Sequence, residues 1–209
     1  MIIAVDGPAA AGKGTIARAL AKHFGLNFLD TGTLYRMVGL SVLQRGADAS
    51  DASAAIAAAE RLDPKSFEDS DLRGEDVGSA ASKVAAVPGV RRALLQFQRD
   101  FASTPPGAVL DGRDIGTVVC PDADAKLFIT ASPEVRARRR QLELEGLGRS
   151  SAYEEVLKDI LARDERDSRR LDAPLRAAPN AAVIDTSDMG IEAALDAAIA
   201  AVETALKAT

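Results

Sequence analysis

The sequence contains few of the residues on which cross-linked and metal-binding proteins depend. Its 209 residues include one cysteine, one histidine and no tryptophan, and aromatic residues make up 4% of the chain. The single cysteine, Cys120, excludes an internal disulfide and fits a reducing compartment. The single histidine, His23, falls inside a predicted helix and is best explained as a surface or packing residue. The sequence therefore offers neither a metal-ligand cluster nor a Ser/His/Asp arrangement.

Long apolar runs are also missing. No uncharged stretch approaches the roughly 20 apolar residues that a membrane-spanning helix needs. Asp6 interrupts the short apolar run at the start, which has no basic segment before it, so we expect no signal peptide and a cytoplasmic location. The net charge of -5 and the isoelectric point of about 5.0 argue against broad nucleic-acid binding. We expect a monomer that acts on small molecules, without a membrane or nucleic-acid partner.

The composition suits a folded α/β protein. Hydrophobic residues make up 47% of the chain and charged residues 27%, which argues against disorder and fits one domain with a small insert. Short apolar segments alternate with segments of helical periodicity. Strands are predicted at residues 2–6, 27–30, 108–112, 125–130 and 182–186, and helices at 14–25, 32–46, 51–62, 77–87, 88–103, 132–146, 150–170 and 190–207. This alternation predicts a five-stranded parallel sheet with helices on both faces.

One edge of the predicted sheet is where we expect a ligand. Ligands of parallel sheets bind beyond the carboxyl ends of the strands. Gly7, Asp30, Asp111 and Asp185 each fall at the end of a predicted strand. The candidate functional residues therefore gather at the carboxyl edge.

A glycine-rich segment, "GPAAAGKGT" at residues 7–15, follows the first predicted strand. It matches the pattern G-x-x-x-x-G-K between a strand and a helix, which is typical of a phosphate-binding loop. In such a loop the backbone N–H groups and the helix N-terminus bind phosphate, and the lysine reaches the β and γ phosphates. The alternative is a glycine-rich turn with a chance lysine. The pattern predicts ATP binding by Gly7, Pro8, Ala9, Ala10, Ala11, Gly12, Lys13, Gly14 and Thr15.

A magnesium ion is expected together with ATP. The loop pattern usually places serine or threonine directly after the lysine, whereas here Gly14 intervenes and Thr15 follows. The hydroxyl of Thr15 can still lie near Mg²⁺. Asp111, at the end of the strand in "AVLDGRD", can hold the ion through water. The alternative for Asp111 is a carboxylate that caps the next turn.

The basic residues are mostly arginine, which makes up 19 of the 26 lysines and arginines. Arg163, Asp167 and Arg170 are spaced i, i+4 and i+7, on a helix face that Val156 and Ile160 begin. Charges on an inward stripe need partners, and a bound polyanion would satisfy the arginines. The alternative is a lattice of salt bridges within the helix, on a solvated face.

A second arginine run, "RARRR" at residues 136–140, places Arg136 and Arg140 on one helix face. The two arginine clusters flank "EGLGRS", where Gly146 and Gly148 permit a bend. This arrangement predicts a helical hairpin that closes over phosphates as a lid. Phosphoryl transfer needs positioning, Mg²⁺ and cations on the developing charge, so an arginine-rich kinase site fits the residues present.

Five segments together resemble the bacterial cytidylate kinase family, within the nucleoside monophosphate kinases. They are "GPAAAGKGT", "LDTGTLYR" (29–36), "ASKVAAVPGVRRALL" (81–95), "DGRDIGTVVCPDADAKLFI" (111–129) and "RDERDSRR" (163–170). The resemblance covers most of the chain. It implies transfer of the γ-phosphoryl group of ATP, with Mg²⁺, to CMP or dCMP, which gives ADP and CDP or dCDP.

The resemblance also implies an acceptor site. The CMP-binding residues would be Thr31, Tyr35, Arg36, Ser82, Arg91, Arg113, Asp114, Arg163, Asp167 and Arg170, and the catalytic residues would be Lys13, Arg113, Arg163 and Arg170. In this set Ser82 and Arg91 would face the pyrimidine, and Arg36, Arg113 and Arg170 would hold the acceptor phosphate. Asp167, held by Arg163, would meet the ribose hydroxyls. Asp114 can accept from the exocyclic amine of cytosine, which uracil lacks.

The predicted organisation is one kinase unit over residues 1–209, of the P-loop NTPase type. Its core would be residues 1–45, 88–131 and 172–209, with an acceptor-binding insert at 46–87 and a lid with the charged helix at 132–171. The family often carries a small three-stranded sheet in the insert. Because residues 62–79 are few for such a sheet, we expect fewer or shorter strands there.

Two other functions stay open. One is a P-loop kinase for a different acceptor, such as AMP, UMP or a small metabolite like shikimate. The other is a nucleotide-binding regulatory module without turnover. The acceptor that is phosphorylated, if any, separates the three.

Overall fold

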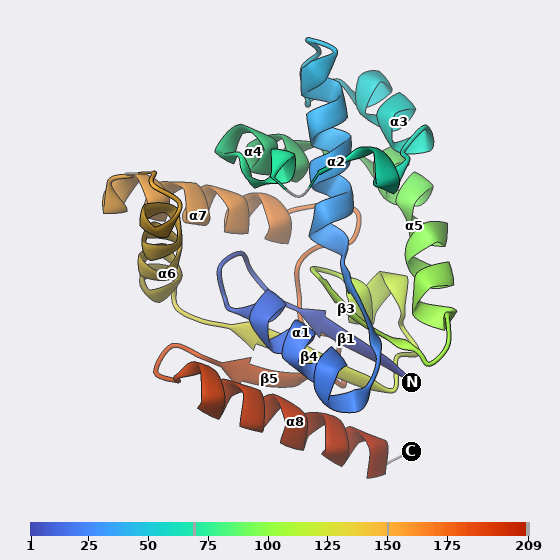
Figure 1. The fold of residues 1–209 in the computed structure, drawn as a ribbon, viewed down its shortest axis with the longest axis vertical. Coiled ribbons are helices and arrows are strands. Elements are labelled where there is room, and N and C mark those ends of the chain that lie inside the picture. The colour runs from blue at the N-terminus through green and yellow to red at the C-terminus, as the bar shows by residue number, and fades with distance from the viewer. Residues whose placement is uncertain (69, 150, 208–209) are drawn as a thin grey trace. The chain divides into compact units, whose positions relative to one another are not determined.

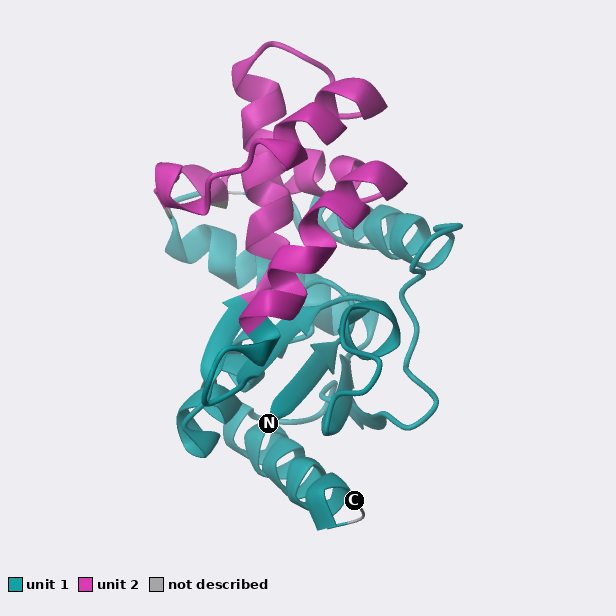
Figure 2. Ribbon diagram, turned by 90° about the vertical axis from the view of Figure 1, so that its right-hand side faces the viewer, with its two compact units in different colours: residues 1–29, 102–209 teal, residues 30–101 magenta. Residues whose placement is uncertain are grey.

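The computed structural model describes residues 1–68, 70–149 and 151–207. The chain divides into two compact units. The first unit comprises Met1–Leu29 and Ala102–Thr209, and the second comprises Asp30–Phe101 (Figure 2). Within the described residues, no helix is both long enough and apolar enough to cross a membrane.

The first unit is built on a five-stranded sheet (Figure 1). Its strands are β1 (Ile2–Asp6), β2 (Asn27–Asp30), β3 (Ala108–Gly112), β4 (Ala125–Thr130) and β5 (Ala182–Asp185). The strand order is β2-β3-β1-β4-β5, and β1 pairs in parallel with both β3 and β4, as β4 does with β5. The register places Val5 opposite Asp111 and Asp6 opposite Gly112. The predicted parallel α/β sheet is confirmed.

The predicted strand ranges match the structure at β1 to β4, and the last strand, predicted at residues 182–186, ends one residue earlier. Asp30 and Asp185 end β2 and β5. Strands β1 and β3 end at Asp6 and Gly112, as their predicted ranges do, so Gly7 lies just after its strand and Asp111 one residue before the end of its strand. The ladder between β1 and β3 extends to Asp6 and Gly112, which keeps both residues extended.

Helices α1 (Lys13–Phe24) and α8 (Ile191–Lys207) form the core of the first unit with the sheet. Ile16 and Leu20 of α1 are buried in one cluster with Val5 of β1 and Ala198 of α8. Gly25 ends α1 in the left-handed conformation, with φ 65°, as expected for a residue just after a helix. The buried apolar side chains, which recur with helical spacing, therefore pack these helices against the sheet.

Helices α6 (Pro133–Gly146) and α7 (Tyr153–Ser168) form the predicted hairpin, and they bury Ala137, Leu144, Val156 and Ile160 in a common cluster. Ser132 caps α6, because its hydroxyl accepts from the N–H of Val135 at 3.3 Å. Gly148 adopts the left-handed conformation in the bend, with φ 72°. Helix α7 ends at Ser168, so Arg170 lies beyond it and not on its last turn as predicted.

A π-helix at Ile115–Val119 follows β3 directly. The sequence analysis assigned no element to these residues. Five residues are too few to show a helical period, and Gly116 and Thr117 favour a turn. This short element fixes the backbone that carries Arg113 and Asp114.

The second unit is helical. It contains α2 (Thr31–Gln44), α3 (Ala52–Glu60), α4 (Glu75–Val84) and most of α5 (Pro88–Ser103), with short 3₁₀ turns at Pro64–Ser66 and Asp71–Arg73. Leu34 and Val38 of α2 pack in its core with Val84 and Leu94. The described residues between 46 and 87 include no strand, which agrees with the expectation of an insert with fewer strands than the family often has.

Candidate functional site

The loop between β1 and α1 has the backbone of a phosphate-binding loop. Gly7 has φ 147°, and a Cβ at this position would lie 1.9 Å from the carbonyl oxygen of Ile129, so only glycine fits. Ala10 and Gly12 are also left-handed, with φ 58° and 88°. Helix α1 then begins at Lys13 and directs its positive N-terminal end toward the loop.

Side chains from the first unit hold three carbonyl groups of this loop. The Nζ of Lys13 donates to the carbonyl of Pro8 at 3.0 Å. The Nη1 of Arg136 donates to the carbonyl of Ala9 at 3.3 Å, and the hydroxyl of Thr186 donates to the carbonyl of Ala11 at 3.3 Å. Because these donors fix the carbonyl groups, the orientation of the intervening peptide units is largely determined.

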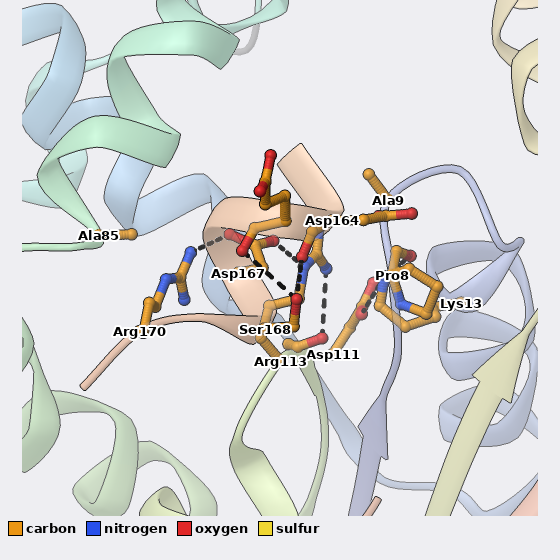
Figure 3. A network of polar contacts seen from close by, with 12 residues as sticks. Pro8, Ala9, Lys13, Ala85, Asp111, Arg113, Asp164, Asp167, Ser168 and Arg170 are labelled. Carbon is orange, nitrogen blue, oxygen red and sulfur yellow. Dashed lines mark hydrogen bonds and ion pairs between the residues drawn. The ribbon is translucent and has the colours of Figure 1, made fainter. Parts of the chain in front are cut away.

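Lys13 and Asp111 lie together at the start of α1. The Nζ of Lys13 is 3.7 Å from Oδ1 of Asp111, and both side chains are buried. A Cβ on Gly14 would be 3.3 Å from Oδ2 of Asp111, which shows how closely β3 approaches the first turn of α1. Figure 3 shows Asp111 beside Lys13 and Pro8. A cation and a carboxylate thus meet at the predicted phosphate site.

The residues predicted to hold Mg²⁺ fit that ion. In the described part of the chain, no group of three or more His, Cys, Asp or Glu side chains is placed to hold a metal. Mg²⁺ prefers oxygen ligands, and it is usually held by one or two carboxylates together with substrate phosphates and water. Asp111 offers a carboxylate, and Thr15, exposed in the first turn of α1, offers a hydroxyl. This donor set suits an ion that arrives with the nucleotide.

A second cluster joins Asp167 to two of the predicted arginines (Figure 3). Asp167 is buried on α7, and its Oδ2 accepts from Nε of Arg113 at 3.1 Å. Its Oδ1 accepts from Nη2 of Arg170. The inward stripe of α7 therefore changes from apolar Val156 and Ile160 to charged Asp167, as the spacing predicted. The alternative of salt bridges within the helix does not describe this cluster, because Arg113 follows β3 and Arg170 lies beyond the end of α7.

Arg163 lies one turn before Asp167 on α7 and is half-buried. The predicted support of Asp167 by Arg163 stays a prediction. The sequence analysis did not anticipate the bond from Arg113, which belongs to the segment after β3. The partner of a charged side chain depends on the tertiary fold, so spacing along one helix does not identify it.

The first turn of the π-helix brings together Asp114 and Asp6. Asp114 is buried and immediately precedes the helix. Asp6, the last residue of β1, accepts from the N–H of Ile115 with Oδ1 and from the N–H of Gly116 with Oδ2, both at 2.7 Å. Burial raises the pKa of Asp6 to about 6, and the two N–H groups offset part of this effect. The sequence analysis missed Asp6, although a carboxylate at the end of a buried strand was a usable signal.

Arg136 and Arg139 of α6 donate hydrogen bonds to other groups of the first unit. Arg136 is buried and donates to the carbonyl of Ala131, to the loop carbonyl of Ala9 and to the carboxylate of Asp164. Arg139 donates to Thr186 through both of its terminal nitrogens. Most donors of Arg136 thus have partners within the first unit, and the lid role of the hairpin stays a prediction.

The remaining predicted residues belong to the second unit. Thr31, Tyr35 and Arg36 lie in the first turns of α2, and the guanidinium of Arg36 donates to the carbonyl of Leu72 at 2.8 Å. The guanidinium of Arg91 lies 5.7 Å from the centre of the Tyr35 ring. It also donates to the carbonyl of Ala85 at 3.4 Å. Ser82 is half-buried on α4, so this unit carries a polar set of its own.

The parallel sheet, the phosphate loop with its lysine and the arginine cluster define a kinase of the P-loop class. The cytidylate kinase family matches residues 3–204. A cytidylate kinase of Afipia carboxidovorans is 55% identical over 205 residues, covering 98% of both chains. One from Methylocella silvestris is 57% identical over 205 residues, covering 98% of this chain and 95% of the relative. The chain belongs to the cytidylate kinase family.

A more distant likeness supports the fold alone. The crystal structure of a gluconokinase from Sinorhizobium meliloti 1021 matches with a TM-score of 0.54 at 16% identity. The match covers 98% of this chain and 93% of the gluconokinase. The two chains therefore share a fold.

Proposed function

We propose that this protein transfers the γ-phosphoryl group of ATP to CMP or dCMP, which gives ADP and CDP or dCDP. The observation that carries the proposal is the family match over residues 3–204, in a chain whose loop at residues 7–15 has the phosphate-binding backbone. Relatives named cytidylate kinase span nearly the whole chain. The first unit holds both a phosphate loop and an arginine cluster, as phosphoryl transfer requires.

ATP would bind through the loop. The N–H groups of residues 7–15 and the N-terminus of α1 favour the phosphates electrostatically. Lys13 forms an ion pair with Asp111, which stabilises the buried ammonium group next to the loop. On binding, Lys13 would contact the β and γ phosphates.

Thr15 and Asp111 would hold Mg²⁺ together with oxygens of the nucleotide. The ion would neutralise charge on the β and γ phosphates. The protein's own part is to keep Asp111 beside Gly14, where the carboxylate also orients Lys13.

In the first unit, Arg113 and Arg170 would contact the acceptor phosphate and the transferred group. Their shared partner Asp167 keeps both guanidinium groups in defined positions before substrate arrives. Such preorganised cations act most strongly where charge develops in the transition state. Arg163 would complete this set, and Asp167 would bind a ribose hydroxyl.

Asp114 would select the base. A carboxylate accepts a hydrogen bond from the cytosine amine, whereas uracil presents an oxygen at that position. In the second unit, the proposed acceptor-binding residues are Thr31, Tyr35, Arg36, Ser82 and Arg91. Arg36 would bind the acceptor phosphate, and Ser82 and Arg91 would face the pyrimidine.

An acceptor panel tests the proposal. ADP release from MgATP is followed by a coupled assay with CMP, dCMP, UMP, AMP or shikimate, using the wild type and Lys13→Met. We expect CMP and dCMP to lead, UMP to be well behind and Lys13→Met to be inactive. Lys22→Met, an exposed lysine at the other end of α1, is the matched control and should keep full activity. Turnover only with AMP or shikimate would replace the proposed acceptor.

Failure to release ADP with every acceptor, despite ATP binding, would favour the regulatory module. The predicted monomeric state and cytoplasmic location stay predictions. Size-exclusion chromatography with light scattering tests the first of these.

A further inference from the structure

The carboxylate of Asp6 performs a capping role that usually belongs to the residue before a helix. A helix N-terminus has N–H groups without partners in the helix, and an Asp at the preceding position commonly accepts from them with its own side chain. In the described part of the chain, the N–H groups at the start of this π-helix are capped by Asp6, which lies on β1. The side chain of Asp114, the residue before the helix, makes no capping bond. The backbone that carries Asp114 is therefore attached to the end of β1.

We propose that Asp6 is a positioning residue for base selection, which holds Asp114 in place by binding the first two N–H groups of the π-helix. This inference rests on the proposed function, in which Asp114 reads the cytosine amine. Asp6 touches neither the base nor the phosphates in this account. It acts through the peptide units of Ile115 and Gly116.

The geometry of this contact requires a carboxylate. Both oxygens of Asp6 accept at 2.7 Å from neighbouring N–H groups, so each oxygen has its own donor. The isosteric amide of asparagine has one oxygen and one NH₂ group, and the NH₂ would face a second donor. A Cβ on Gly116 would lie 3.4 Å from Oδ2 of Asp6 and 3.1 Å from Cδ of Lys126, so this peptide unit has little space in which to shift.

The burial of Asp6 carries an energetic cost. Desolvation raises its pKa most, and the charge of Asp114 raises it further, whereas the two N–H groups and Lys13 lower it. With a pKa of about 6, the ionised form still predominates at pH 7. A carboxylate retained in a buried place, with both oxygens on one short helix, is consistent with a positioning role.

The test compares two carboxylates that accept from backbone N–H groups. Asp6→Asn removes one of the two bonds to the π-helix. Asp124→Asn is the matched control, because Asp124 accepts from the N–H of Ile2 at the opposite end of β1. For the wild type and both variants, kcat and KM are measured with CMP, UMP and ATP.

We expect Asp6→Asn to raise the KM for CMP and to lower the ratio of kcat/KM for CMP over UMP by about tenfold or more. The KM for ATP should change by less than about threefold. Asp124→Asn should keep the wild-type ratio. If Asp6→Asn keeps the wild-type ratio, or loses activity with CMP and UMP equally, the inference is overturned while the proposed function stands.

If the wild type itself fails to prefer CMP over UMP, the proposed function fails at Asp114 and the inference fails with it.

If Asp6→Asn does not fold, the ratio of kcat/KM for CMP over UMP is followed in the wild type between about pH 7 and pH 5. CMP and UMP carry the same phosphate group, so its titration cancels in the ratio. The charged groups that act on Asp6 are Asp114 and Lys13. The ratio should fall as Asp6 takes up its proton, and a constant ratio would overturn the inference.

Discussion

Arg136 of α6 and Asp164 of α7 form a two-pronged ion pair, with Nη1 3.0 Å from Oδ1 and Nη2 2.5 Å from Oδ2. The same guanidinium donates from Nε to the carbonyl of Ala131 at 2.8 Å and from Nη1 to the carbonyl of Ala9. A single arginine side chain of α6 thus contacts both α7 and the loop at residues 7–15. The base of the hairpin and the loop at residues 7–15 are held by a shared contact within the first unit.

Removing this contact should cost stability and weaken ATP binding. For Arg136→Met we expect the free energy of unfolding to fall by roughly 3 kcal/mol, because Asp164 loses its partner and the helices lose their tie. The KM for ATP should rise as well, because Ala9 loses a donor. Urea denaturation and steady-state kinetics measure the two effects.

The control is a solvent-exposed pair at the C-terminal end of α7. Arg169 and Glu165 lie 2.8 Å apart with side chains 80% and 61% exposed, whereas that of Arg136 is 3% exposed. Arg169→Met should change the free energy of unfolding by less than about 1 kcal/mol. Equal losses in the two variants would contradict the role of Arg136.

Asp114→Asn should reduce the selection of cytosine over uracil. An asparagine side chain can donate to the uracil oxygen as well as accept from the cytosine amine. We expect the ratio of kcat/KM for CMP over UMP to fall by about 10- to 100-fold. The exposed Asp122, a few residues further along the chain, provides the control Asp122→Asn, whose ratio should match the wild type. An unchanged ratio in Asp114→Asn would remove this residue from base recognition.

Arg170→Ala should act mainly on kcat. The guanidinium of Arg170 is held by Asp167, so its charge is positioned before the reaction begins. A cation that stabilises developing charge contributes most in the transition state. We expect kcat to fall about 100-fold, with a KM for CMP within about threefold of the wild type. Arg169→Ala, at the exposed neighbouring position, should be fully active. A rise in KM alone would make Arg170 a binding group only.

The pH dependence of stability should carry a signature of Asp6. Its pKa is 3.8 in a model peptide and about 6 in the folded protein, so between these values the folded state retains a proton that the unfolded state releases. The contribution of Asp6 to the free energy of unfolding is therefore greatest below the lower value. It declines by about 3 kcal/mol as the pH rises through the higher one.

Asp6→Asn cannot titrate, so its stability should lack this decline. Relative to the wild type, the variant should gain about 2 kcal/mol between pH 4 and pH 7, whatever it loses in hydrogen bonds. Urea denaturation of both proteins across this range measures the difference. If the difference in the free energy of unfolding is independent of pH, Asp6 does not have a raised pKa.

Much of the fold could be predicted from the sequence, because its elements leave local patterns. The apolar runs at residues 2–6 and 125–130 and the helical period of residues 14–25 all correspond to observed elements. The π-helix at Ile115–Val119 could not be predicted, since five residues show no period. The predicted ranges of β1 and β3 match the structure, and the two strands pair as far as their last residues, Asp6 and Gly112.

The candidate site divides in the same way. The loop at residues 7–15 is a continuous motif, and its backbone matches the pattern. The inward stripe that ends at Asp167 follows from helical spacing. The role of Asp6 was missed because its partners lie 109 or more residues away in the chain. The role of Arg136 was missed because it depends on the packing of two helices against the loop.

Direct observation of the product tests the central claim. The ³¹P NMR spectrum of purified protein with MgATP and CMP should show the CMP resonance replaced by the two resonances of CDP, with ADP formed in equal amount. Lys13→Met should leave the spectrum of the substrates unchanged. Loss of ATP to ADP and inorganic phosphate, with CMP untouched, would contradict the account.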